Sequence, residues 1–207
     1  MLTSDVIAFV RASLPPAPAR ILEVGAGRGE LAADLRAAGY DVVAIDPAAE
    51  PGTGVEPISL IDAEGLFDAA VAIVALHHVD PLEASCAHLA TLIAPGGRLV
   101  IDELDIDRYD DRATQWWWAQ RRALGADHAA HTDSDPAEIL AHMRAHIHPL
   151  DAVRAALRPH FTLGEPVRGP YLHRWELLAS LGEVETDLIA RGRLPATGAR
   201  LVATRDG

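Results

Sequence analysis

The chain has 207 residues, 49% of them hydrophobic and 23% charged, and its formal net charge is −12. This length suits one domain with a substantial core. The excess of acidic residues disfavours nucleic acid as a partner, because phosphates are bound by clustered Lys and Arg. No apolar run approaches the roughly eighteen residues that span a bilayer, and the N-terminus lacks a signal-peptide pattern, so we expect no membrane partner. One cysteine, Cys86, cannot form an internal disulfide, which suits the cytoplasm.

The first half of the chain alternates apolar runs with amphipathic stretches. The pattern predicts helices over residues 3–14, 29–38 and 80–93, and strands over 20–24, 41–46, 55–60, 67–76 and 98–101. In the third helix, we expect Asp80 to act as the N-cap and Pro81 to occupy the first helical position. Strands and helices that alternate at this spacing predict a doubly wound, parallel sheet.

From Asp102 onward the pattern changes. Residues 106–158 are polar, rich in His and Trp, and helical in pattern, and we predict that they form a helical lid over the carboxyl edge of the sheet. One lid helix holds Trp116, Trp117 and Trp118, and another begins at Asp135 with an acidic capping pattern. In residues 159–207 we expect two closing strands, at 161–168 and 199–204, with a helix over 175–190 between them.

A glycine-rich turn follows the first predicted strand directly. A buried strand, the sequence Gly25-x-Gly27-x-Gly29 and an amphipathic helix form the opening of a nucleotide-binding βα unit. The second strand ends in Asp46, about twenty residues later, where an acid can accept hydrogen bonds from ribose hydroxyls. A dinucleotide site favours glycine at the sixth position of the turn, which is Glu30 here. Glu23, just before the turn, suits a cationic amino group better than a phosphate.

Glu23-x-Gly25-x-Gly27-x-Gly29 resembles the first motif of class I S-adenosylmethionine-dependent methyltransferases. Residues 67–79 look like the fourth-strand segment of that family, and residues 92–101 look like its turn into the fifth strand. The resemblance covers roughly the first half of the chain. It implies one domain over 1–207 with a Rossmann-like, doubly wound, seven-stranded and mostly parallel α/β sheet. The cofactor half would be 1–105, the lid 106–158 and the closing elements 159–207, with the closing strands antiparallel at the far edge.

The resemblance also implies a cofactor, S-adenosylmethionine, and a product, S-adenosylhomocysteine. Gly25 and Gly27 would contact the methionine portion, Asp46 would hold the ribose, and Pro47 would pack on the adenine. Asp62 is the candidate for the adenine amino group. The full predicted cofactor set is Glu23, Gly25, Ala26, Gly27, Gly29, Asp46, Pro47, Asp62, Ala75 and Leu76.

His77 and His78 leave the fourth predicted strand where the methyl group should lie, and imidazole titrates near neutrality. We expect one of them to orient or deprotonate the substrate, although capping or core packing is the alternative. Glu103 and Asp105 are candidates for the same work. The predicted substrate-binding residues are Glu103, Trp116, Trp117 and Tyr171.

Two of these features have competing interpretations. The tryptophan triplet either packs in a core and a dimer contact or forms an aromatic wall of the substrate pocket. His142 and His146, four residues apart on a predicted helix, have metal-ligand spacing, and His128, His131, Asp133 and His148 lie nearby. Because the spacing fixes no third ligand, we expect no metal.

The predicted function is methyl transfer by in-line displacement to a small molecule, at oxygen, nitrogen or carbon, by a monomer or homodimer. A nicotinamide-dependent oxidoreductase, using NAD or NADP, is an alternative that Glu23 and Glu30 disfavour. A second alternative is a protein that binds S-adenosylmethionine without transferring its methyl group, because a fold alone does not secure a reaction.

Overall fold

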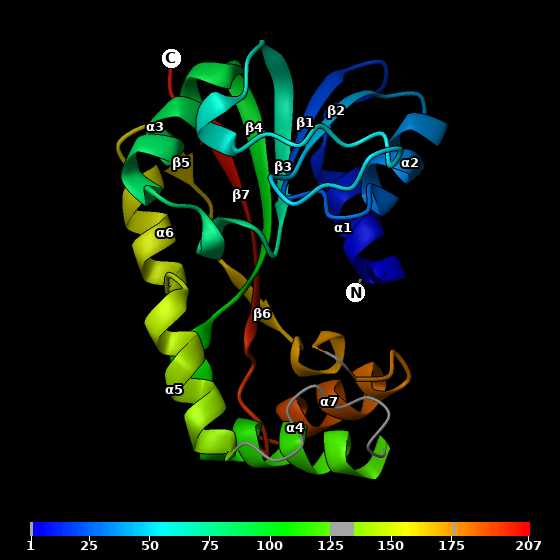
Figure 1. Ribbon diagram of the computed structural model, residues 1–207, viewed down its shortest axis with the longest axis vertical. Coiled ribbons are helices and arrows are strands. Elements are labelled where there is room, and N and C mark those ends of the chain that lie inside the picture. The colour runs from blue at the N-terminus through cyan, green and yellow to red at the C-terminus, as the bar shows by residue number, and fades with distance from the viewer. Residues whose placement is uncertain (1, 125–134, 176) are drawn as a thin grey trace.

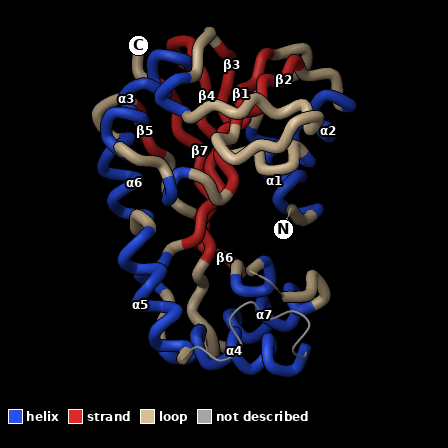
Figure 2. Tube along the Cα trace, viewed as in Figure 1, coloured by secondary structure: helices blue, strands red, loops and turns tan. Residues whose placement is uncertain are grey.

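The protein consists of two lobes, an α/β lobe and a smaller helical lobe beyond one end of the sheet (Figure 1). The computed structural model describes residues 2–124, 135–175 and 177–207. Figure 2 shows that the sheet belongs mainly to the upper lobe, and that β6 and the adjoining part of β7 lead into the lower one. Within the described ranges, no helix has both the length and the apolar character needed to cross a bilayer.

The helices and strands follow the predicted alternation in the first half of the chain. The helices are α1 (Ser4–Ser13), α2 (Glu30–Ala37), α3 (Leu82–Leu92), α4 (Asp111–Leu124), α5 (Pro136–His146), α6 (Leu150–Leu157) and α7 (Leu181–Ala190). The strands are β1 (Arg20–Val24), β2 (Asp41–Ile45), β3 (Phe67–Ile73), β4 (Ile93–Leu104), β5 (Phe161–Leu163), β6 (Val167–Gly169) and β7 (Gly198–Arg205). Short 3₁₀ turns include η1 (Leu60–Asp62), η2 (Leu76–His78), η3 (Ile106–Arg108) and η5 (Leu172–Arg174).

The seven-stranded sheet has the order β2-β1-β3-β4-β7-β5, and β6 also pairs with β7. Strands β1 to β4 are mutually parallel, and β7 runs antiparallel to β4, β5 and β6. The predicted Rossmann-like, mostly parallel α/β fold is therefore confirmed. Parallel strands with both faces covered read as continuous apolar runs, and for this reason β1 and β3 were recognisable in the sequence.

Helices cover both faces of the sheet (Figure 1). α1 and α2 bury Val6, Val10 and Leu35 against one face. α3 and α6 bury Leu89 and Leu157 against the other face. Cys86, on α3, lies in the second of these cores, and burial raises the pKa of its thiol to about 12, which fits a packing residue.

Several predicted elements differ from the structure. The expected strand at 55–60 is reduced to one parallel bridge between Ile45 and Glu56, and Pro57, which has no N–H for a ladder, follows at once. The seventh strand arises instead because the predicted strand at 161–168 is divided into β5 and β6. The predicted helix over 175–190 begins only at Leu181.

Other boundaries moved by smaller amounts. β3 ends at Ile73, so the segment to Leu76 is a turn, and β4 begins at Ile93, immediately after α3. Asp80 makes no capping bond: Pro81 is the N-cap of α3, and the helix begins one residue later. By contrast, the Asp135 side chain accepts a hydrogen bond from Ala137 N–H and caps α5, as predicted.

α6 packs with α3 against the sheet rather than in the lid, so the helical lobe extends only to about residue 149 before the chain returns to the α/β lobe. α4, the lower part of α5 and α7 make up that lobe (Figure 1). Apolar residues of α5, including Ile139 and Met143, pack against its core.

The tryptophan triplet belongs to the core of the helical lobe. Trp117 is 1% exposed, its ring stacks on that of Trp175 with 3.9 Å between centroids, and its indole N–H donates to the Trp175 carbonyl at 2.9 Å. Trp116 and Trp118 are half-buried at the edge of the same core. Core packing, the first interpretation of the triplet, is therefore the one that the structure supports.

We predict that Trp117→Ala lowers the free energy of unfolding by about 3–5 kcal/mol, because it removes a buried aromatic side chain and leaves a cavity. The half-buried neighbour Trp116 is the matched control, and Trp116→Ala should cost about 1 kcal/mol. Urea denaturation followed by circular dichroism measures both. Equal losses for the two variants would contradict the packing described here.

Candidate functional site

The glycine turn after β1 lies against the segment that follows β3. Gly25, Gly27 and Gly29 have φ angles of +70°, +55° and +75°, which disfavour any side chain. A Cβ atom on Gly25 would lie 2.5 Å from the Cβ of Ala75, so only glycine permits this approach. A Cβ on Gly27 would meet no atom within 4 Å, because this part of the turn faces open space.

Glu23 lies at the base of a cavity of about 290 Å³, which we call the glycine-turn cavity. The side chain is 5% exposed, and its Oε2 atom has no hydrogen-bond partner among the described residues. Burial raises the pKa of Glu23 to about 7, against an opposing effect of the Arg36 guanidinium. The residues around it are Leu2, Gly25, Ala26, Gly27, Arg28, Glu30, Leu31, Ile73, Val74 and Arg174.

Asp46 follows β2 and faces a second cavity of about 320 Å³, the Asp46 cavity. Its Oδ2 atom accepts a hydrogen bond from Gly27 N–H at 2.9 Å, and its Oδ1 atom accepts one from Ala48 N–H at 2.8 Å. The carboxylate therefore ties the glycine turn to the end of β2. Predicted residues that line this cavity are Gly25, Asp46, Pro47, Ala75 and His78.

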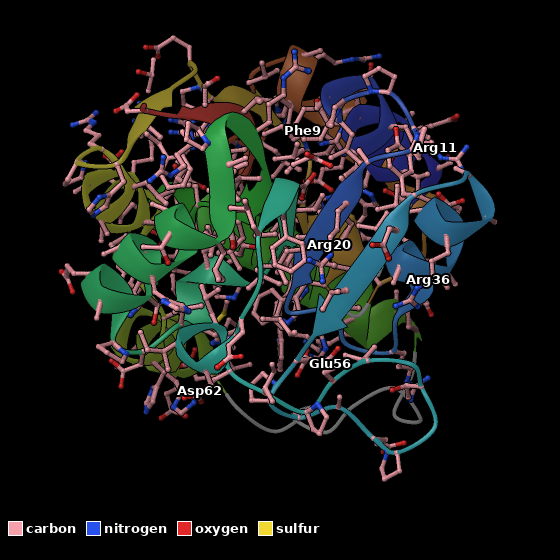
Figure 3. The ribbon with its side chains drawn as sticks, turned by 90° about the horizontal axis from the view of Figure 1, so that it is seen from above. Phe9, Arg11, Arg20, Arg36, Glu56 and Asp62 are labelled. Carbon is pink, nitrogen blue, oxygen red and sulfur yellow. The ribbon has the colours of Figure 1, made fainter. Side chains whose placement is uncertain are left out.

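Three predicted cofactor residues, Gly29, Asp62 and Leu76, line neither this cavity nor the glycine-turn cavity. Leu76 is fully buried, and Asp62 is exposed, with its carboxylate accepting from the Ser59 hydroxyl at 2.5 Å. Figure 3 shows Asp62 on the outside of the loop that precedes β3. Ser59 and Ile61 line the cavity instead, and they were not recognisable in the sequence because the strand predicted over 55–60 is replaced by a loop and a 3₁₀ turn.

Val74 lies where three cavities meet. It lines the glycine-turn cavity, the Asp46 cavity and a third cavity of about 310 Å³. Its φ angle is +54°, a strained value for a β-branched residue. Its N–H donates to the Asp102 carbonyl at 2.7 Å, which fixes the bend at the end of β3.

Glu103, on β4, holds the turn that follows Val74. Its Oε1 atom accepts from the N–H groups of Ala75 and Leu76 at 2.9 and 2.7 Å, and its Oε2 atom lies 2.7 Å from His77 Nδ1. The residue is 1% exposed and lines none of the three cavities that Val74 joins. The structure thus gives Glu103 protein partners on both oxygens, and its predicted contact with substrate stays a prediction. Asp105 is likewise engaged, in an ion pair with Arg168.

The third cavity, which we call the histidine cavity, lies between the two lobes. Its walls come from the turn after β3, including η2, from the end of β4, from α5 and from the two residues that flank η5. They consist of Val74, His77, His78, Leu104, His142, Met143, His146, Ile147, Tyr171 and Trp175. Partial burial and the neighbouring His77 lower the pKa of His78, which favours a neutral ring at pH 7.

The aromatic wall of this cavity differs in part from the predicted one. Tyr171 lines it as expected, whereas Trp116 and Trp117 do not, and Trp175 takes their place. Trp175 was assigned to a helix in the sequence, so its position beside the cavity could not be inferred from the pattern.

His142 and His146 also line the histidine cavity, and their rings stack with 4.0 Å between centroids. The Nδ1 atom of His146 hydrogen-bonds to the His142 carbonyl at 2.7 Å. Within the part of the chain that the structure describes, no three His, Cys, Asp or Glu side chains converge as metal ligands. His128, His131 and Asp133 lie outside the described residues.

The doubly wound sheet, the glycine turn and an acid after the second strand define a Rossmann-like protein with a site for a nucleoside-containing cofactor. A family profile described as a methyltransferase domain matches residues 3–142. The chain therefore belongs to this methyltransferase family, as the sequence resemblance indicated.

Two curated relatives match part of the chain. An uncharacterized methyltransferase of Mycobacterium bovis is 40% identical over 100 residues, which cover 42% of this chain and 40% of the relative. The ubiquinone biosynthesis O-methyltransferase of Xanthomonas axonopodis pv. citri is 33% identical over 114 residues, which cover 47% of this chain and 48% of the relative. The chain thus matches less than half the length of either relative.

A solved structure extends the likeness to the whole fold. The geranyl diphosphate C-methyltransferase of Streptomyces coelicolor, in complex with Mg²⁺, geranyl diphosphate and S-adenosylhomocysteine, has a TM-score of 0.61 and 15% identity. The match covers 98% of this chain and 78% of that one. At this identity the comparison concerns the fold alone.

The raised pKa of Glu23 predicts a pH-dependent stability of the cofactor-free protein. The folded protein keeps the Glu23 proton up to about pH 7, whereas the unfolded chain releases it near the ordinary pKa of 4.5. Protonation of Glu23 therefore favours the folded state, and this contribution to the free energy of unfolding is complete below pH 4.5 and is lost as the pH rises through 7. Glu23→Gln removes this dependence and should raise the free energy of unfolding at pH 8, by about 3 kcal/mol at most, but not at pH 4.

Urea denaturation at pH 4, 6 and 8 measures the difference between variant and wild type. The control is Glu30→Gln, at an exposed acid that begins α2. Its free energy of unfolding should differ from that of wild type by a small amount that does not depend on pH. A constant difference for Glu23→Gln across this range would show that the Glu23 pKa is ordinary.

Proposed function

We propose that this chain binds S-adenosylmethionine and transfers its methyl group to a small molecule. The observation that carries the proposal is Glu23, a buried carboxylate beside the glycine turn whose Oε2 atom has no hydrogen-bond partner within residues 2–124, 135–175 and 177–207. A buried carboxylate is costly unless it is paired, so this site favours a bound cation. The ammonium group of a methionine moiety supplies one.

The residues present fit the rest of the cofactor. The open space beside Gly27 admits a ligand against the backbone, and Arg174, which also lines the glycine-turn cavity, offers a cation to the methionine carboxylate. Asp46 is positioned to accept from ribose hydroxyls, and Pro47 and Ile61 provide apolar surface for the adenine. Asp62 stays a candidate for the adenine amino group only if its loop moves inward.

The bound cofactor supplies a sulfonium methyl, which passes in line to a nucleophile and leaves the thioether S-adenosylhomocysteine. The protein contributes mainly position, which is worth about 7–11 kcal/mol in well-oriented systems. The histidine cavity is the proposed acceptor pocket, because Val74 and His78 border both it and the Asp46 cavity. Its volume of about 310 Å³ suits a small molecule rather than a macromolecule.

The names of the relatives are consistent with this proposal. The Xanthomonas protein is named for O-methylation in ubiquinone biosynthesis, and the Streptomyces enzyme for C-methylation of geranyl diphosphate. The net charge of −12 further argues against nucleic acid as the acceptor. We propose a cytoplasmic monomer or homodimer.

Calorimetric titration with S-adenosylhomocysteine, and separately with NAD⁺, tests the cofactor. We expect micromolar binding of S-adenosylhomocysteine, no heat from NAD⁺, and a 10- to 100-fold loss of affinity in Asp46→Ala, about 1.4–2.8 kcal/mol. Asp41→Ala, at the exposed opposite end of the same strand, is the matched control and should bind like wild type.

The result would decide between the candidate functions. Binding of NAD⁺ alone would replace the methyltransferase proposal with the oxidoreductase alternative. Binding of S-adenosylhomocysteine, followed by the absence of methylated product across a broad screen of acceptors, would favour the non-catalytic cofactor-binding protein.

A further inference from the structure

We infer that His77 is the general base of this site, that Glu103 is its positioning residue, and that the acceptor is a weakly acidic hydroxyl group on an aromatic ring. This inference rests on the proposed function, because it names the acceptor of the same reaction. It goes beyond that function by choosing one of two adjacent histidines and one class of acceptor.

The hydrogen bond to Glu103 determines the tautomer of His77. The Glu103 carboxylate accepts hydrogen bonds only, so the contact of 2.7 Å between Oε2 and Nδ1 requires a proton on Nδ1. In a neutral ring, Nε2 is then the basic atom. Because His77 lines the histidine cavity, this base belongs to the wall of the proposed acceptor pocket.

The pair formed by His77 and Glu103 is buried. His77 is 3% exposed and Glu103 is 1% exposed, so little solvent screens their interaction. When Nε2 takes a proton, the imidazolium is paired at once with a buried carboxylate that the Ala75 and Leu76 N–H groups already orient. The same logic operates in a catalytic Ser-His-Asp triad, where the carboxylate fixes the tautomer and stabilises the imidazolium.

His77 and His78 differ in how firmly hydrogen bonds hold them. His78 is exposed, and no hydrogen bond from its ring to a protein group fixes its tautomer among the interactions described here. The His77 backbone is also restrained, since its carbonyl accepts from His148 N–H at 2.9 Å. A base must be held within hydrogen-bond reach of its proton, and His77 is the histidine that the structure holds.

The walls of the histidine cavity indicate the class of acceptor. The side chains of Met143, Tyr171 and Trp175 offer apolar and aromatic surface, and the described lining holds no Lys, Arg, Asp or Glu. Such walls suit a flat, uncharged ring. A neutral imidazole deprotonates a phenolic hydroxyl far more readily than an aliphatic alcohol, because a phenol has a pKa near 10.

The proton and methyl balance follows directly. The hydroxyl proton moves to His77 Nε2, and the oxygen then forms an O–CH₃ bond with the methyl group that leaves the sulfonium sulfur. The products are the methyl ether, S-adenosylhomocysteine and one proton, which His77 releases to solvent.

Nitrogen-15 NMR of the cofactor-free wild type tests the tautomer. We expect the neutral His77 ring to carry its proton on Nδ1, and to shift toward the Nε2–H form in Glu103→Gln, whose amide can donate to Nδ1. His77→Asn assigns the signal. The other titratable groups around the ring, which must be assigned in the same spectra, are His78, Glu103, His142, His146, His148 and Tyr171.

Absorption spectroscopy with 4-nitrophenol tests the acceptor class, because this phenol and its phenolate absorb at different wavelengths. In protein saturated with S-adenosylhomocysteine, we expect the bound probe to ionise about tenfold more readily than free probe, with the effect lost in His77→Asn and Glu103→Gln. His160→Asn, at a histidine outside the cavities described here, is the control and should behave like wild type.

The outcomes separate the inference from the proposed function. An Nε2–H tautomer in the wild type would overturn the role of His77. A probe that leaves the cavity histidine signals unshifted, or that binds without enhanced ionisation, would overturn the acceptor class. In either case, if the protein still binds S-adenosylhomocysteine, the proposed function is retained. If the protein does not bind S-adenosylhomocysteine, both the proposed function and this inference are wrong.

Discussion

The buried carboxylate of Glu103 is the constraint on which the rest of the site depends. A carboxylate with 1% exposure is tolerable because three donors, two backbone N–H groups and the His77 ring, satisfy its oxygens. Those donors belong to the turn that follows Val74, so the carboxylate also helps to hold a strained backbone at the point where three cavities meet. The position of Ala75, against which Gly25 packs, follows from the same turn.

The helical lobe repeats this device. Glu185, on α7, is fully buried and accepts from the N–H groups of Tyr171, Leu172 and His173, and also from His173 Nδ1. In each lobe, a buried glutamate thus holds a 3₁₀ turn and the ring of a histidine in it. One such turn supplies His77 to the histidine cavity, and residues at the ends of the other, Tyr171 and Trp175, supply its opposite wall.

A charged network connects the two lobes. Asp102, buried at the end of β4, pairs with Arg174 from η5 and with Arg200 from β7, and Arg200 continues to Asp5 on α1. Arg174 also lines the glycine-turn cavity, so a residue of the helical lobe forms part of the proposed cofactor site. Removing one member would leave a buried charge without its partner, which is why such networks fix geometry more than they add stability.

The parts of the protein that could be predicted from sequence are those set by local pattern. The glycine turn, β1, β2 and the placement of Asp46 follow from apolar runs and glycines whose φ angles no other residue adopts easily. The predicted third strand is absent because pairing is decided by the neighbouring strand, and Pro57 has no N–H to continue the ladder beyond Glu56. The positions of Trp117 and Trp175 depend on packing between segments 58 residues apart, which no local pattern encodes.

The two glutamates at strand ends show where strand-end reasoning reaches its limit. Both Glu23 and Glu103 lie where a parallel sheet binds ligands, and the sequence predicted a ligand for each. The structure separates them by their hydrogen bonds: Glu103 accepts from three protein donors, whereas Glu23 Oε2 accepts from none of the described residues. Glu103 is buried, has both oxygens engaged by protein donors and lines none of the three cavities, which fits the positioning role that we infer for it. A buried carboxylate left unsatisfied by the protein costs free energy in the cofactor-free state, and binding of a cationic group recovers it. For these two buried glutamates, the hydrogen bonds to the protein, rather than the place on a strand, therefore distinguish the inferred positioning residue from the proposed binding residue.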